Sequence, residues 1–361
     1  MPSATTELTD PATTGDIPTR AAAFPQLRYM GSKHRLLPWI HSVLGTLRFE
    51  SSLDAFSGSG AVAYLLKTMG KQVTACDFLN FPFQIARASV ENQGELLSDD
   101  DLAALTAENP GRRTFIETTF GGVFFTPADL RFLDTLWSNL PRLESPLLRA
   151  LAIAAAVRAC VKRQPRGVFT ITGDAAKYDD GRRDLRLGLQ EHFMESARAY
   201  NATVFDNGQR NLALRSDVFA APAADVDLVY LDPPYVPRAD DNCYIKRYHF
   251  LEGLSSYWTD EGTDIIFETK ARKIAKRYTP FSYRRTAVDA FDRMFRHFAE
   301  STIVLSYSSN GFPDLDVLVS LLKRYKREVE VFERPHRYHF GTHGQVAEAR
   351  ASVREYLIVG D

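Results

Sequence analysis

Cysteine is scarce in this chain of 361 residues: Cys76, Cys160 and Cys243 are scattered and form no CxxC pair. Such a set does not suit a disulfide framework and predicts reduced thiols. Residues 1–23 lack the basic and apolar regions of a signal peptide, so we expect a flexible tail there. The longest apolar run, 147–161, is interrupted by arginines and is too short to span a bilayer. These absences predict a cytoplasmic protein with no membrane partner.

Internal repeats are absent as well, and the length favours about two domains, or one domain with an insertion. Strand and helix patterns alternate before residue 96 and again after about residue 211. The residues between them have mostly helical patterns, with one strand-like run at 168–171. A connection of this length far exceeds an ordinary loop. We therefore expect one α/β domain, made of residues 24–95 and 200–361, and a helical insertion at 96–199.

The net charge of −1 does not by itself indicate a nucleic-acid partner, but the charges are segregated along the chain. Residues 91–110 carry acids and no bases, whereas residues 270–285 carry bases and no acids. Such segregation in a nearly neutral chain suggests a one-sided electrostatic surface. A solvated helix face remains the alternative for either run taken alone.

The sequence Asp232-Pro233-Pro234-Tyr235 follows directly on the apolar run 228–231. A buried parallel strand that leads into a ligand site has this pattern, because functional groups gather beyond the carboxyl ends of such strands. The two prolines stiffen the chain and remove two backbone donors. Asp232 and nearby carbonyl groups can accept hydrogen bonds from an amine, and Tyr235 offers a flat surface to its ring. A strand followed by a simple proline turn is the alternative.

A glycine-rich turn, with Gly58 and Gly60, follows a predicted strand, and Asp77 ends the next one. This spacing fits a dinucleotide-binding site, in which the acid binds ribose hydroxyls. The same physics serves any adenosine cofactor, and an isolated tight turn also remains open. An NAD enzyme is therefore possible, but that interpretation gives no role to residues 232–235.

A further motif lies upstream, where Tyr29, Gly31 and Lys33 precede the first long helix. Lys33 at a helix start can hold a carboxylate, Gly31 permits close approach of a ligand, and Tyr29 can stack on it. Without its context this segment would also suit an ordinary helix start.

Taken in order, these motifs closely resemble the D12-type, alpha-group N6-adenine DNA methyltransferases, the family of the Dam methylases. The resemblance covers residues 26–360 except the helical insertion, where only position and charge correspond. It extends to the segments 244–252, 305–308 and 355–358. It implies an α/β fold with a Rossmann-like methyltransferase core. That core would have a mostly parallel seven-stranded sheet with a terminal β-hairpin, and residues 96–199 would form an inserted target-recognition domain.

The resemblance also implies a cofactor, S-adenosyl-L-methionine, and a role for each matching residue. Asp232, Pro233, Pro234 and Tyr235 would be catalytic. For Asp217 a helix N-cap in a strand-to-helix turn is the alternative interpretation. The cofactor-binding residues would be Tyr29, Gly31, Lys33, Asp54, Phe56, Gly58, Gly60, Asp77, Asp217 and Asp232.

Double-stranded DNA would be the substrate, with the target adenine flipped out of the helix. Asp232 and the Pro233 carbonyl would accept the N6 hydrogen bonds and free the lone pair for attack on the methyl group. The chain has no Pro-Cys pair, which argues against a cytosine-C5 enzyme. Two basic stretches would contact phosphates. The residues expected to bind DNA are Lys162, Arg163, Arg166, Arg182, Arg183, Arg186, Lys273, Lys276 and Arg277.

Three alternatives share these motifs: a methyltransferase acting on RNA, one acting on a protein glutamine, and an inactive DNA-binding relative. Asp232 argues against the first two, which more often carry asparagine before the prolines, and the intact motifs argue against the third. The histidine-rich segment 336–343 has no acid or cysteine close by, so we expect no metal site. A cognate restriction endonuclease remains a possible partner.

Overall fold

The computed structural model describes residues 8–9, 17–165, 167–170, 172, 181–237, 243–277, 279–337 and 352–361. Within these ranges, no helix combines the length and the apolar character needed to cross a membrane. Of the histidine-rich segment, only His336 and Arg337 fall within the described residues.

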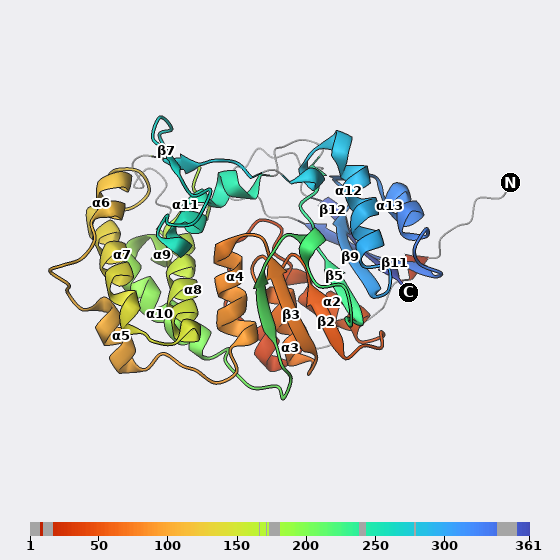
Figure 1. Cartoon of the computed structure of the whole chain (residues 1–361), viewed down its shortest axis with the longest axis horizontal. Helices are drawn as coiled ribbons and strands as arrows, with labels where there is room; N and C mark the ends of the chain where they lie inside the picture. The colour runs from red at the N-terminus through yellow and green to blue at the C-terminus, as the bar shows by residue number, and fades with distance from the viewer. Residues whose placement is uncertain are drawn as a thin grey trace.

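Within the described residues, one eight-stranded sheet forms the centre of the molecule (Figure 1), in the order β1-β11-β12-β9-β5-β2-β3-β4. Strands β4, β3, β2, β5 and β9 run parallel, and β12 is antiparallel to both β9 and β11. This order confirms the predicted Rossmann-like sheet with its terminal hairpin and adds the short edge strand β1. The bounds are β1 Leu8–Thr9, β2 Ser51–Asp54, β3 Gln72–Asp77, β4 Leu212–Arg215, β5 Leu228–Leu231, β9 Thr302–Ser308, β11 Val329–Arg337 and β12 Ser352–Gly360.

Strand β5 shows why the sheet has helices on both faces. All four of its residues are buried, as expected for a central parallel strand. Leu228 and Tyr230 point into one hydrophobic core, and Val229 and Leu231 into a second. The first core contains α2 (Leu37–Leu44) and α3 (Ala61–Thr68), and the second contains α12 (Arg284–His297) and α13 (Leu315–Leu322).

A group of helices lies beside the sheet (Figure 1), and α4 stands between this group and β3. Helix α8 packs against both α4 and α10, and this packing buries a long run of alanines and aliphatic residues on α8. One continuous core therefore joins these helices to the first face of the sheet. The bounds are α4 Asn80–Ala86, the π-helix η2 Arg87–Glu91, α5 Asp99–Thr106, α6 Phe115–Phe120, α7 Pro127–Asn139, η3 Leu140–Arg142, α8 Pro146–Arg163, α9 Arg183–Arg186 and α10 Leu189–Asn201.

Two local expectations differ from the structure. Residues 168–170 of the strand-like run form a bend and turn, not a strand, because Phe169 is fixed by hydrogen bonds to Arg247 and His249 of α11. Within the expected tail, Thr19–Ala22 form α1 and bury Ala21. The remaining elements are η1 His34–Leu36, η5 Val218–Ala220, β6 Val236–Pro237, α11 Tyr244–Ser256, β7 Ile265–Ile266, β8 Lys273–Ile274, η6 Pro280–Ser282 and β10 Gly311–Phe312.

Candidate active site

A pocket lies at the carboxyl ends of β2, β3 and β5, the edge at which open α/β sheets bind ligands. Three segments supply most of its lining: residues 29–33 before η1, the turn after β2, and residues 77–79 after β3. Asp232 and Pro234 line it from beyond β5, and Tyr244 lines it from the start of α11. The pocket thus joins motifs that are about 200 residues apart in the sequence.

The glycine turn is shaped by backbone geometry that other residues rarely adopt. Gly58 has φ +49° and Gly60 has φ +79°, values at which a β-carbon is strained. A Cβ on Gly58 would lie 3.0 Å from Cε1 of Tyr29. The Gly58 N–H donates to Oδ2 of Asp77 at 2.9 Å, so the acid that ends β3 fixes the turn after β2.

Asp232 and Lys33 form the central ion pair of the pocket, with Nζ and Oδ1 2.9 Å apart. Lys33 also donates to the Gly31 carbonyl at 3.2 Å, and its side chain is only 5% exposed. Burial raises the pKa of Asp232, and the charge of Lys33 opposes that rise. The Asp232 side chain keeps 20% of its exposure, so a substrate in the pocket can reach it.

Two further acids are buried around the pocket. Burial raises the pKa of Asp54 to about 8, and the neighbouring charge of Asp232 adds to the shift. Burial raises the pKa of Asp77 to about 7, although hydrogen bonds from Leu79 and Gly58 oppose it. Burial disfavours the charged forms of these carboxyl groups, and a nearby positive charge would favour them again. The pocket is therefore a favourable place for a cation.

A tyrosine cluster closes one side of the pocket. The ring of Tyr29 stacks on that of Tyr248 with centroids 4.9 Å apart, and Tyr244 lies 5.4 Å from Tyr29. Tyr248 Oη accepts from the Met30 N–H at 2.7 Å, and Tyr244 Oη donates to the Met30 carbonyl at 3.2 Å. The first turns of α11 thereby fix the segment that precedes Gly31. In the sequence, the spacing of Tyr244 and Tyr248 by about one helical turn indicates that the two rings lie on the same face of a helix.

The residues after Asp232 are held by a second small sheet. β6 pairs with β10, which places Phe312 opposite Val236. The ring of Tyr235 lies 4.9 Å from that of Tyr307 on β9. A Cβ on Gly311 would lie 2.9 Å from the Tyr235 ring and 2.6 Å from Tyr307 Oη. Glycine at position 311 is therefore needed for these rings to keep their places.

The structure brings most of the predicted cofactor-binding residues together. All of them line the pocket except Gly60 and Asp217, and of the predicted catalytic residues Asp232 and Pro234 do so. Asp217 is exposed and caps η5, since its Oδ1 accepts from the Phe219 N–H at 2.9 Å. Among the lining residues that sequence reasoning missed are Phe78, Leu79 and Tyr244. Phe78 and Leu79 follow Asp77 directly. An apolar pair next to a predicted pocket acid could have indicated them.

Four of the nine predicted DNA-binding residues are engaged in ion pairs within the protein. Lys162 lies 3.1 Å from Glu195 and 3.6 Å from Asp184. Arg163 pairs with Asp129, and Arg183 with Glu195. Arg182 donates to the Pro165 carbonyl at 2.7 Å, Arg186 is exposed, and Arg166 lies outside the described residues. Lys273 lies in β8, Lys276 is exposed beyond it, and Arg277 contacts Glu252.

Comparison with known proteins agrees with this arrangement. The type II methyltransferase M2.HphI of Haemophilus parahaemolyticus is 29% identical over 333 residues, covering 87% of this chain and 92% of that protein. The type II methyltransferase M.NlaIII of Neisseria lactamica is 22% identical over 325 residues, covering 83% and 88%. The modification methylase LlaI of Lactococcus lactis subsp. lactis is 29% identical over 99 residues, 27% of this chain and 15% of that protein.

The model of one protein family spans the pocket and the parallel strands from β2 into β9. It matches residues 29–306, from the tyrosine that borders the glycine turn to the strand beside β5. This range holds the glycine turn and the Asp232 segment, and the family is one of DNA-modifying enzymes. The chain is a DNA methyltransferase and belongs to the D12 class of N6 adenine-specific DNA methyltransferases.

Proposed function

We propose that this DNA methyltransferase transfers the methyl group of S-adenosyl-L-methionine to the exocyclic N6 amine of adenine in double-stranded DNA. The observation that carries the proposal is the position of Asp232. This carboxylate follows β5, borders the pocket of the glycine turn, and is paired with Lys33 at 2.9 Å. The family to which the chain belongs is described by the same specificity.

The residues of the pocket fit this cofactor. Each oxygen of Asp77 accepts one backbone N–H, at 2.9 Å, and retains a lone pair for a ribose hydroxyl. Gly58 lets a ligand approach the backbone, and Phe56, Phe78 and Val62 supply apolar lining. When bound, S-adenosyl-L-methionine supplies a methyl group on a positively charged sulfur. The carboxyl groups of Asp54, Asp77 and Asp232, which line the pocket, suit that charge.

Asp232 would act on the adenine amine, which is a weak nucleophile because its lone pair is delocalised into the ring. Asp232 and the Pro233 carbonyl would accept the two N–H bonds and favour the geometry in which the lone pair is available. Lys33 supports this role because its charge favours the ionised form of Asp232, the form that accepts hydrogen bonds. This chemistry rests on positioning and electrostatics.

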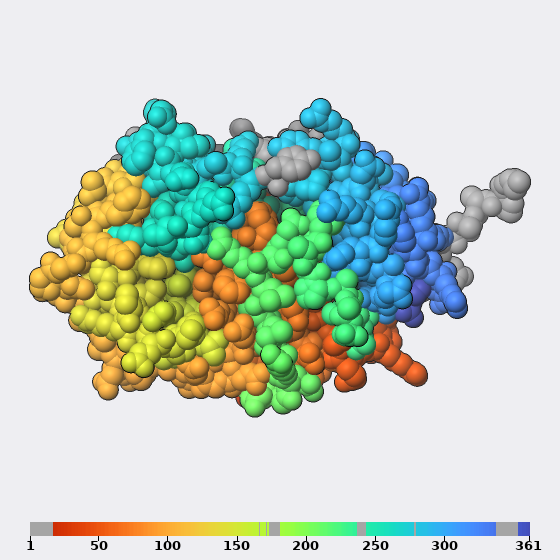
Figure 2. All heavy atoms as spheres, in the orientation of Figure 1, coloured from red at the N-terminus to blue at the C-terminus, as the bar shows by residue number. Residues whose placement is uncertain are grey.

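Duplex DNA would approach the edge of the sheet where the pocket lies, and the target base would leave the helix. Figure 2 shows two protrusions along the upper edge of the molecule, one around the β7–β8 hairpin and one in the residues that begin α12. The basic run 270–285 extends from the first to the second. Phosphates between the protrusions would meet this run. The helices from α5 to α10 would form the target-recognition part of the chain.

A product analysis tests the proposal. Purified protein and labelled S-adenosyl-L-methionine are incubated in three parallel reactions. One contains duplex DNA, one contains structured RNA, and one contains a glutamine-containing peptide. Nucleosides and amino acids are then separated by mass. We expect N6-methyladenine from DNA alone. A methylated cytosine, or label in RNA or peptide at a higher rate, would contradict the proposal.

The relatives named type II methyltransferases suggest a cellular setting. We propose that this enzyme protects DNA against a partner endonuclease that recognises the same sequence. Sequencing of methylated sites in DNA from a host that expresses the chain would give the target sequence. DNA methylated in this way should resist a cognate nuclease.

A further inference from the structure

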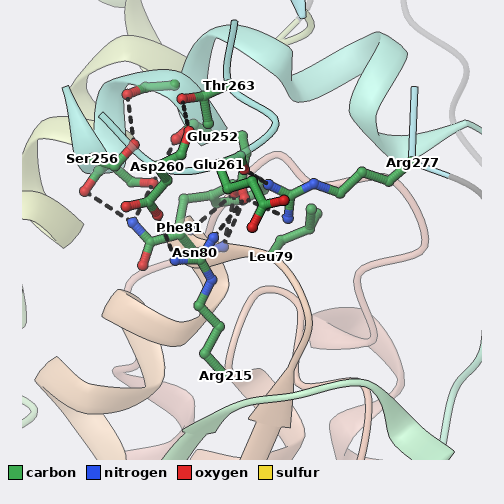
Figure 3. Close-up of polar contacts among 12 residues, drawn as sticks. Leu79, Asn80, Phe81, Arg215, Glu252, Ser256, Asp260, Glu261, Thr263 and Arg277 are labelled. Carbon is green, nitrogen blue, oxygen red and sulfur yellow. Dashed lines mark hydrogen bonds and ion pairs between the residues drawn. The ribbon is translucent and has the colours of Figure 1, made fainter. Parts of the chain in front are cut away.

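Beyond the pocket, a buried carboxylate on α11 connects segments that are far apart in the sequence (Figure 3). Glu252 has 0% exposure. Its Oε2 accepts from the N–H groups of Asn80 at 2.8 Å and Phe81 at 3.3 Å. The Asn80 side chain donates in turn to the Ser255 carbonyl and Oγ, each at 3.0 Å. Helix α11 therefore holds the first residues of α4 in place.

Those residues follow the pocket directly. Asp77, Phe78 and Leu79 line it, and α4 begins at Asn80. The Leu79 N–H donates to Oδ1 of Asp77 at 2.9 Å, so the turn between β3 and α4 is fixed at both ends. A shift of Glu252 would therefore be transmitted to Asp77, the proposed ribose ligand.

On its other side, Glu252 meets two arginines. Its Oε1 lies 3.4 Å from Nη1 of Arg277 and 3.7 Å from Nη2 of Arg215. Arg215 also pairs with Asp260, and Nη2 of Arg277 donates to the Glu261 carbonyl at 3.0 Å. A fully buried carboxylate depends strongly on such partners, because an unpaired buried charge is costly.

Arg277 is the member of this group that extends toward the proposed DNA surface. It belongs to the basic run 270–285, and its side chain is 24% exposed. A guanidinium has five N–H donors in a fixed plane. Arg277 can thus keep its contacts with Glu252 and Glu261 and still present N–H groups to a phosphate.

We propose that Glu252 is a positioning residue that couples the cofactor pocket to the DNA surface through Arg277. A cofactor bound to Asp77 further restrains the Asp77–Leu79 turn, the restrained turn holds Glu252 more firmly, and Glu252 holds Arg277 in the orientation that meets a phosphate. Cofactor and DNA therefore strengthen each other's binding, as reciprocal linkage requires. This inference rests on the proposed function, since it needs both ligands.

The test measures the affinity of a DNA duplex with and without saturating S-adenosylhomocysteine, which lacks the transferable methyl group and the sulfonium charge. For the wild type we expect the duplex to bind about fivefold more tightly or better with this ligand, the lower end of usual couplings. In Glu252→Gln, which keeps an acceptor for Asn80 but removes the charge, the ratio should fall toward one. In Arg277→Ala, Glu252 keeps Arg215 as an ionic partner, so the variant should remain folded and show the same loss.

Lys276→Ala is the matched control, because it removes a neighbouring exposed charge, whereas Glu252 forms its ion pairs with Arg277 and Arg215. It should weaken DNA binding equally with and without S-adenosylhomocysteine and keep the wild-type ratio. A wild-type ratio near one, or a ratio that persists in Arg277→Ala, overturns the coupling. A wild type that binds neither S-adenosylhomocysteine nor the duplex would instead overturn the proposed function.

Discussion

Buried acids occur both at the pocket and among the helices beside the sheet, and the two groups differ in the hydrogen bonds that they accept. Asp134 on α7 accepts N–H bonds from Ile116 at 3.0 Å and Glu117 at 2.8 Å, and an O–H bond from Tyr257 at 2.6 Å. Asp54 accepts a long bond from the Phe56 N–H, at 3.4 Å, and burial raises its pKa to about 8. The helical region satisfies its acids internally, whereas the pocket keeps acceptor capacity for a ligand.

The largest effect should come from the acid closest to the proposed chemistry. We expect Asp232→Ala to lower the methylation rate by at least about a hundredfold, since a preorganised polar group is lost where charge develops. Single-turnover rates with labelled cofactor would measure this. The control is equilibrium binding of S-adenosylhomocysteine, which should change by a few-fold at most. A variant that retains full activity would remove Asp232 from the mechanism.

The corresponding change among the helices should affect stability and leave the chemistry intact. Asp134→Ala leaves two backbone N–H groups and the Tyr257 hydroxyl without their acceptor, and we expect a loss of about 2–5 kcal/mol in the free energy of unfolding. Urea titration would measure the loss. The folded fraction should bind S-adenosylhomocysteine with wild-type affinity, and a large loss of that affinity would erase the contrast between the two regions.

The pocket acids should make the stability of the cofactor-free protein depend on pH. The folded-state pKa values of Asp54 and Asp77, about 8 and about 7, lie above those of the unfolded chain. The folded protein then binds more protons, so stability falls as pH rises between about 4 and 8. Melting temperatures should decrease over this range, and less steeply in Asp54→Asn. Parallel curves for the two proteins would contradict the raised pKa of Asp54.

The smallest effect is expected where an exposed base already has a partner. Arg183 pairs with Glu195 at the surface, and such exposed pairs contribute little to stability because solvent screens them. We expect Arg183→Ala to change stability little and to lower DNA affinity less than Arg186→Ala does. Titrations of duplex DNA at several salt concentrations would rank the two variants. A larger effect for Arg183 would mean that it leaves Glu195 to bind phosphate.

The sequence predicted those parts of the structure that depend on neighbouring residues. The apolar run 228–231 indicated β5, and the glycine turn with Asp77 indicated the β2–β3 unit, because strand and turn preferences are local. The partners of Lys162 were not predictable, since Asp184 and Glu195 reach it only through the packing of α8 against α10. The same limit applies to residues 168–170, where contacts with α11 override a β-branched pattern.

The continuous core that joins the helices to the sheet constrains how such an enzyme can be re-engineered. Ile85 and Val90 beside the sheet belong to the same buried cluster as Ala155 on α8 and Phe193 on α10. A chimera that exchanges the helices for those of a relative must therefore carry over the surface that packs on α4. Grafts cut at the sequence boundaries alone would leave mismatched side chains in the interior. New sequence specificity is better sought by replacing solvent-facing residues while the shared interior is kept.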